Sequence, residues 1–244
     1  MAETVSDPRR TAVQQGLFSR ALASISQAIL WLLFSLMFSI VVEWVGMVYW
    51  WQDEGLDHSR TMIANEISYL DTEFRRSVVT SDPARFAKAV ADGTYHYLFE
   101  VTRVVACIHW VSPPPRQQEK GLRPTLHKIY QPLAQFVIAA MQMTQVFAVR
   151  LAILILATPV FLLFSLVALV DGLVKRDLRR WGGGRESSFV YHYAKKAGLP
   201  LVVIAWVTYL ALPFSLHPTF IVLPFAALFA FAVAVTASTF KKYL

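Results

Sequence analysis

The sequence predicts an all-α fold, an integral membrane helical bundle of four transmembrane helices with a small helical extracytoplasmic domain. Of its 244 residues 56% are hydrophobic and only 16% are charged, whereas soluble domains are about 25% charged. Residues 151–170 form a run of twenty residues without a charge. Twenty helical residues span about 30 Å, the thickness of the hydrocarbon core of a bilayer.

The segment after this run sets the expected orientation. Residues 171–198 contain seven Lys and Arg side chains against three acidic ones. Short loops with such an excess of positive charge remain in the cytoplasm. We therefore expect residues 171–198 to form a basic cytoplasmic loop, and the other spans must be threaded to agree with it.

The chain begins with a polar segment, residues 1–24, which we place in the cytoplasm. Residues 25–49 are predicted to form the first transmembrane helix, too long for the apolar part of a signal peptide. Aromatic side chains close this helix and are typical of a membrane interface: Trp44, Tyr49, Trp50 and Trp51. Glu43 is an ionisable residue inside the span, where either a contact between helices or a role with an ion or proton would explain it.

Residues 50–130 are predicted to form the helical domain outside the cytoplasm, because residues 52–130 contain ten acidic and ten basic side chains. Ser81-Asp82-Pro83 has the pattern of a helix start, with a capping side chain followed by Pro. Asp92 and Gly93 are predicted to end that helix. The lone cysteine, Cys107, lies in an apolar run and is expected to be buried.

Residues 131–170 are predicted to form one long helix, whose part 151–170 is the second transmembrane helix. Arg150 would then extend its charged end to the outer interface. A rival interpretation makes residues 133–149 a separate span, although three Gln side chains and a length of 17 residues argue against it.

Two further spans complete the predicted bundle. Residues 199–216 and 220–240 are the third and fourth transmembrane helices, and the tail 241–244 returns to the cytoplasm with two Lys residues. Small residues recur every fourth position in the last helix, a pattern that lets helix backbones approach closely: Ala226, Ala230, Ala234 and Ser238. The partner of this face could be the third span or another chain, so a homo-oligomer is one outcome.

The sequence contains no motif for catalysis, a cofactor or a metal. The six His residues show no pair at a metal-binding helical spacing. The glycine-rich stretch 182–188 lacks the Lys of a phosphate-binding loop and follows a membrane helix where that motif needs a strand. We therefore expect a protein that is not an enzyme and uses no cofactor.

The basic segment allows two interpretations. It could anchor the chain to anionic lipid of the bilayer, or it could dock a protein partner through mixed charged and aromatic side chains. The docking candidates are Asp171, Lys175, Arg176, Arg179, Arg180, Trp181, Arg185, Glu186, Tyr191 and His192. Direct nucleic-acid binding is disfavoured, because acidic side chains are mixed into the segment, which lies against the membrane.

Residues 171–196, together with the motif Glu43-Trp-Val-Gly-Met47 and Trp50-Trp51, resemble the integrating conjugative element membrane protein family. The resemblance implies an uncharacterised component of the bacterial inner membrane, encoded with the type IV secretion and coupling machinery that moves DNA between cells. It also implies a partner in that machinery, with the coupling ATPase as the leading candidate. The family brings no catalytic residues.

Three functional hypotheses follow. The first is an inner-membrane component of conjugative DNA transfer that positions a partner. The second is a small transporter or channel subunit with a polar path through Glu43, Gln142, Gln145 and Arg150. The third is mating-pair stabilisation or transfer exclusion through the outer segment.

Overall fold

The computed structural model describes residues 17–73, 80–114, 121–182 and 188–240, and every regular element in these ranges is helical. The elements are α1 (Leu17–Tyr49), α2 (Leu56–Glu73), α3 (Pro83–Tyr95), the π-helical turn η1 (His96–Glu100), α4 (Val104–Val111), α5 (Leu122–Trp181), α6 (Ser188–Ala211) and α7 (Thr219–Thr239). The all-α prediction is therefore confirmed for the described part of the chain.

Among the described residues, four helices are long and apolar enough to cross a membrane, as the sequence predicts. The candidate spans are Ile25–Tyr49, a part of Leu122–Trp181, Phe189–Ala211 and Thr219–Thr239. The third differs from the predicted 199–216, because α6 begins at Ser188 and ends at Ala211. Its early end has a local cause: Leu212 precedes Pro213, and a residue before Pro is disfavoured in a helix.

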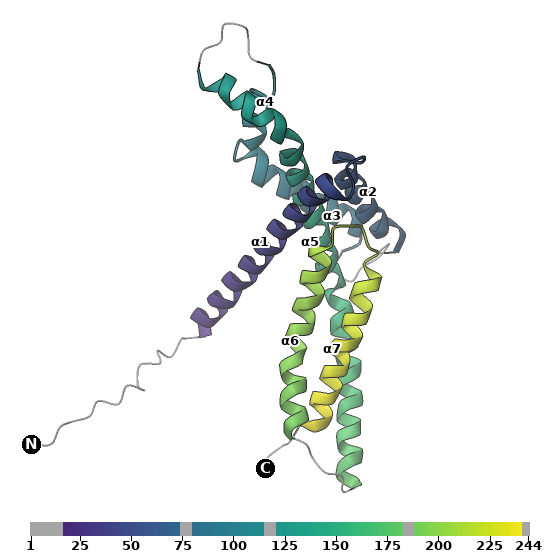
Figure 1. The fold of residues 1–244 in the computed structure, drawn as a ribbon. Helices are drawn as coiled ribbons and strands as arrows, with labels where there is room; N and C mark the ends of the chain where they lie inside the picture. Colours follow the sequence, from purple (N-terminus) through teal and green to yellow (C-terminus); the bar gives the residue numbers. More distant parts are fainter. Residues whose placement is uncertain (1–16, 74–79, 115–120, 183–187, 241–244) are drawn as a thin grey trace, which may run out of the picture.

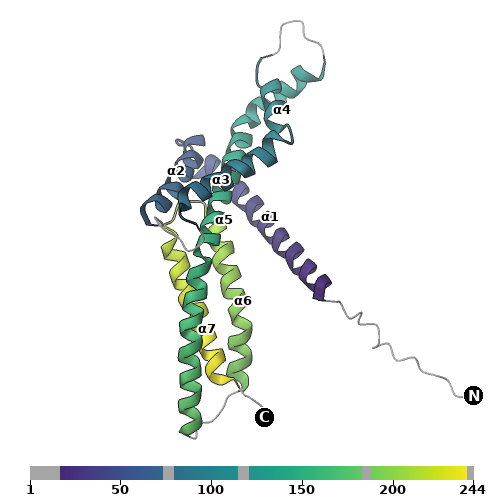
Figure 2. The same cartoon turned by 180° about the vertical axis from the view of Figure 1, so that it is seen from behind.

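The C-terminal half of α5 packs with α6 and α7 into a three-helix bundle (Figure 1). Helices α2 and α3 lie across the upper end of this bundle. Helix α1 meets the bundle at the same end and leans away from it, while α4 and the first turns of α5 project as an arm. Figure 2 shows from behind that α5 runs from this arm to the opposite end of the molecule.

Helix α5 contains 60 residues, which corresponds to a length of about 90 Å. Residues 131–170, including 133–149, lie inside this one helix. The basic segment 171–198 is itself largely helical, because α5 continues to Trp181 and α6 begins at Ser188. The first helix breaker after residue 170 is Gly172, which stays helical; the chain leaves the helix only at Gly182.

Helix α3 begins where the sequence predicts. Pro83 is its first residue, and the Asp82 side chain accepts a hydrogen bond from the Arg85 backbone N–H at 3.0 Å. Its predicted end at Gly93 is wrong, since the helix continues to Tyr95 and into η1. A single Gly inside a helix costs only about 1 kcal/mol relative to Ala and does not by itself end the helix.

The small residues of α7 face α5 as well as α6. A Cβ atom on Gly172 of α5 would lie 2.6 Å from the Ala234 carbonyl oxygen, so the two backbones are nearly in contact there. Ala226 is fully buried in a cluster with Ala157 of α5 and Ala205 of α6. Within this chain, the predicted small-residue face thus contacts α5 at Ala234 and both α5 and α6 at Ala226.

Candidate functional site

A cluster of buried polar side chains lies where α2 meets α5 and α6. The Arg150 Nε–H donates a hydrogen bond to Glu66 at 2.8 Å, and the Tyr209 hydroxyl donates to the other carboxylate oxygen at 2.7 Å. All three residues have an exposed fraction of 0%. Charges are kept in such a place only when they are paired and hydrogen-bonded. The cluster therefore fixes the positions of three helices relative to one another.

Arg150 also binds the segment that directly follows α6. Its two terminal nitrogens donate to the carbonyl oxygens of Leu212 at 2.6 Å and of Phe214 at 2.8 Å. Leu212 directly follows the last residue of α6, and a positive charge is favourable beside the C-terminus of a helix. One guanidinium group thus joins α2 and α5 to the segment that connects α6 with α7.

The Arg150 side chain does not extend to solvent, as the predicted snorkelling conformation would require. It is fully buried, because Glu66 neutralises its charge and two backbone carbonyls accept two further hydrogen bonds. Sequence reasoning missed Glu66, although a signal exists. Glu66 lies four residues from both Met62 and Leu70, which are buried on the same face of α2.

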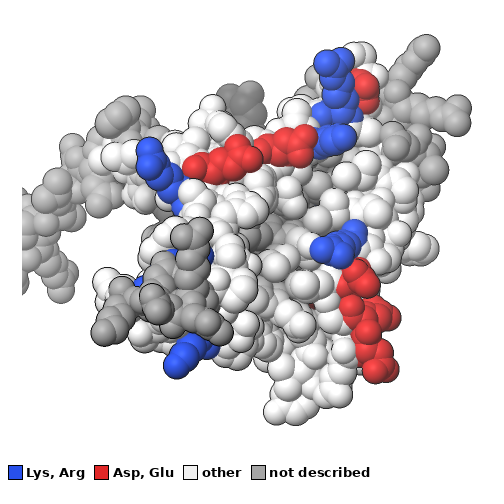
Figure 3. All heavy atoms as spheres, turned by 90° about the horizontal axis from the view of Figure 1, so that it is seen from above, with Lys and Arg blue, Asp and Glu red and all other residues white. Residues whose placement is uncertain are grey.

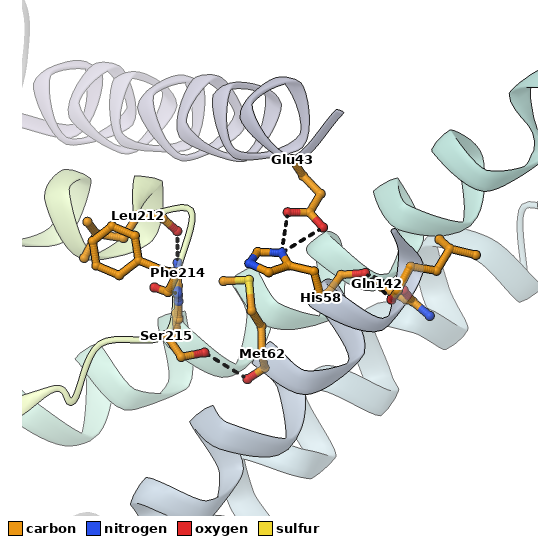
Figure 4. Close-up of polar contacts among 10 residues, drawn as sticks. Glu43, His58, Met62, Gln142, Leu212, Phe214 and Ser215 are labelled. Carbon is orange, nitrogen blue, oxygen red and sulfur yellow. Dashed lines mark hydrogen bonds and ion pairs between the residues drawn. The ribbon is translucent and has the colours of Figure 1, made fainter. Parts of the chain in front are cut away.

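A second polar contact joins α1 to α2 (Figure 4). Glu43 is fully buried, and its carboxylate oxygens lie 3.2 and 3.1 Å from the His58 Nδ1 atom. Ser35 and Ser39 are also buried, about two turns and one turn before Glu43 respectively. Polar side chains therefore lie on the packed face of α1 beside apolar ones such as Leu36 and Ile40. This geometry fits the interpretation of Glu43 as a contact between helices.

Trp51 is not part of an exposed aromatic belt. Its ring stacks on His58 with centroids 4.1 Å apart, and it lies so close to Gly46 that a Cβ atom there would be 1.8 Å from the ring. Tyr49 and Trp50 remain exposed, at 74% and 67%. Tyr49 and Trp50 are therefore exposed as a membrane-interface belt requires, whereas Trp51 packs on His58 and holds that ring beside α1.

The residues of the hypothetical transport path do not come together. Gln142 accepts a hydrogen bond from Ser59 at 2.6 Å. A cavity of about 380 Å³ between α4 and α5 is lined by Gln142 and Gln145, but Glu43 and Arg150 are not among its lining residues. Both charged groups are instead paired in separate contacts. The geometry gives no support to a continuous polar path.

Most charged side chains of the basic segment that lie at the end of α5 are exposed to solvent. Lys175 pairs with Asp171 at 2.6 Å, as the spacing of four residues predicts. Arg176 lies 3.5 Å from Asp177. Trp181 is 91% exposed at the end of α5. This end of the bundle therefore presents cations beside an exposed aromatic ring.

The other docking candidates are divided between two helices and a segment outside the described residues. Arg179 and Arg180 lie in the last turn of α5, and His192 is exposed on α6. Tyr191 is half-buried on α6, with its ring 5.9 Å from that of Phe240. The candidates Arg185 and Glu186 fall within residues 183–187 and thus outside the described ranges.

The opposite face of the molecule has a different character. Figure 3 shows side chains of both signs there, with the acidic ones in small groups that have basic side chains beside them. This agrees with the equal numbers of acidic and basic residues in 52–130. Cys107, predicted to be buried, is exposed. Within the described ranges, no three His, Cys, Asp or Glu side chains are grouped so as to hold a metal ion.

The comparison with protein families gives one match. Residues 50–241 match the family model described as IncC plasmid conjugative DNA transfer protein DtrJ-like. This agrees with the conjugative part of the sequence resemblance, although the description refers to a plasmid and not to an integrating element. No curated protein and no solved structure is significantly similar to the chain.

Proposed function

The chain belongs to the DtrJ-like family of conjugative DNA transfer proteins, and from this premise we propose that it is a non-enzymatic component of the bacterial inner membrane. In the proposal it holds a cytoplasmic partner of the transfer machinery, such as the coupling ATPase, in position. The family description names DNA transfer and no reaction. The basic end of α5 and α6 would be the docking surface.

The observation that carries the proposal is the exposed Trp181 beside Arg179 and Arg180. An aromatic ring that is 91% exposed and lies beside Arg side chains is typical of the anchors at protein interfaces. A purely local explanation accounts for the cations, since positive side chains stabilise a helix C-terminus. It does not account for the exposed ring, which a partner or the lipid interface would cover.

The arrangement of the helix ends supports a threading with both termini in the cytoplasm. The beginning of α1, the end of α5 and the end of α7 point to the same side, opposite α2, α3 and α4 (Figure 1). Four spans would produce this alternation. The basic residues 171–198 would then face the cytoplasm, as their charge predicts.

Crosslinking and co-purification from a conjugating donor strain test the docking role. We expect replacement of Arg179, Arg180 and Arg185 by Ala to reduce both recovery of the partner and DNA transfer, with the protein still inserted. A matched control removes three exposed cations at the other end of the molecule, Arg85, Lys88 and Lys128. Docking at the basic end is refuted if the first variant retains its partner and transfers DNA normally.

The outer arm supports a second candidate, the mating-pair or transfer-exclusion role. Apolar side chains on η1, α4 and the residues between them are exposed, including Tyr97 at 70%, Val101 at 60% and Trp110 at 49%. Exposed apolar surface outside a membrane often marks an interface. This role predicts a phenotype in recipients, so scoring a deletion separately in donors and recipients distinguishes the two candidates.

A further inference from the structure

An apolar groove lies between α5, α6 and α7 near the basic end of the bundle. Its volume is about 580 Å³, and its walls include Leu169, Leu199, Phe229 and Val233. These walls belong to helices that are candidate membrane spans. The groove therefore faces the hydrocarbon core if the bundle is inserted, and a chain of methylene groups is the chemistry that fits it.

Two cations line the same groove, Arg176 from α5 and Lys195 from α6. The Arg176 Nε atom is buried and has no hydrogen-bond partner among the described residues. Its guanidinium group lies 3.5 Å from the exposed Asp177 carboxylate. Lys195 lies 5.9 Å above the Tyr191 ring, and within the described ranges it forms no ion pair. A buried N–H without a partner is costly, so an anionic acceptor beside Arg176 would be stabilising.

The geometry points to a binding site for one molecule of an anionic phospholipid. The headgroup phosphate would accept hydrogen bonds from Arg176, including its free Nε–H, and an ionic contact from Lys195. An acyl chain would lie along the apolar groove. This inference requires the membrane insertion assumed in the proposed function but is independent of the docking role.

A soluble phosphate compound would use only half of the site. The two cations would attract it, but the apolar walls would remain exposed to the lipid environment. A zwitterionic phospholipid would fill the groove but would bring a positive group to two cations. The site is therefore identified by selectivity for a ligand that has both an anionic headgroup and acyl chains.

Native mass spectrometry of the detergent-purified full chain tests the inference, with dioleoyl phosphatidylglycerol compared with dioleoyl phosphatidylcholine. We expect one phosphatidylglycerol to bind selectively. Arg176→Gln with Lys195→Gln should weaken this binding about 30-fold, since each cation near an anionic headgroup contributes about a fivefold change. The control pair Arg179→Gln with Lys196→Gln removes the same charge from the same helices outside the groove lining.

A third variant tests the apolar part. A Cβ atom on Gly198 would lie 3.6 Å from the Phe229 ring, an ordinary contact, and Leu is a better helix former than Gly. Gly198→Leu should thus fold normally, fill the groove and abolish selective binding with both cations present. Glycerol 3-phosphate, which has no acyl chains, should not displace the lipid.

Several results would overturn the inference. Equal weakening by the groove pair and the control pair would mean that general surface charge attracts the lipid. Normal binding by Gly198→Leu, or displacement by glycerol 3-phosphate, would remove the groove from the site. Extraction of the protein from membranes by alkaline carbonate would refute the membrane insertion itself, whereas an inserted protein without selective binding would refute the lipid site alone.

Discussion

Replacing Arg150 by Met is expected to be the most damaging single change in the bundle. The guanidinium group makes hydrogen bonds to Glu66, Leu212 and Phe214 at 2.6–2.8 Å from a side chain with no exposure. Its loss leaves the Glu66 carboxylate buried with Tyr209 as its donor. Removing one partner of a buried ion pair costs about 3–5 kcal/mol.

Thermal unfolding of the purified protein in detergent measures this cost. For a chain of this size 1 kcal/mol corresponds to about 2–4 °C in Tm, so we expect Arg150→Met to lower Tm by about 10 °C. The control is Arg60→Met, which breaks the exposed ion pair with Asp57. Pairs of that kind contribute less than about 1 kcal/mol, so the control should unfold close to the wild-type temperature.

A double-mutant cycle shows whether the loss comes from the pair itself. Glu66→Leu combined with Arg150→Met removes both charges, so the double variant should be clearly more stable than the sum of the single losses predicts. The coupling should exceed about 2 kcal/mol, since residues in one buried network are not additive. Additive losses, or an Arg150→Met variant that unfolds within about 2 °C of wild type, would refute the buried pair.

Two further predictions concern helix contacts. Gly172→Val should lower the free energy of unfolding by about 1–3 kcal/mol, because its side chain would meet the Ala234 backbone. Gly93→Ala, with no atom within 4 Å of the new Cβ, should instead raise it by about 0.5–1 kcal/mol. Denaturant titration of both variants checks this, and a similar effect of the two changes would contradict the close approach of α5 and α7. His58→Phe should keep the stack on Trp51 but leave the Glu43 carboxylate buried without its partner, which lowers the free energy of unfolding by about 1–3 kcal/mol. Adding Glu43→Gln should recover part of this loss. The same titration tests the contact, and a His58→Phe variant with the wild-type free energy of unfolding argues against it.

The helices themselves could be predicted from the sequence because each depends on local information. An uncharged run of twenty residues has few alternatives to a helix in a membrane protein. The start of α3 could be predicted in the same way, since Asp82 and Pro83 act on the backbone of the next few residues. The long helix through residues 131–170 was predicted for a similar reason.

The polar contacts could not be predicted because they depend on how helices pack. Ten acidic residues lie in 52–130, and only the docking of α2 onto α5 decides that Glu66 meets Arg150. Without a known partner, Arg150 between two apolar stretches was assigned to the interface. Trp51 was assigned to the aromatic belt for the same reason, since its stacking on His58 requires α2 to turn back against α1.

The pairing of Arg176 with Lys195 in the groove could not be predicted from the sequence either. All four cations lie in one basic segment, and nothing in the sequence indicates that Arg176 and Lys195 line a groove while Arg179 and Lys196 do not. Only the packing of α5 against α6 brings the first two into the same groove. Residues of equal charge in one segment therefore acquire different roles through the direction in which each helix presents them.

In the proposed threading, α3 and the basic end of α5 lie on opposite sides of the inner membrane. Cysteine labelling distinguishes the two sides, with single Lys88→Cys and Arg180→Cys variants in a Cys107→Ser background and a maleimide that cannot cross the inner membrane. We expect the cysteine at position 88 to be labelled from the periplasm, and the one at position 180 to be labelled only after the inner membrane is permeabilised. Labelling of both positions from the same side would contradict this threading.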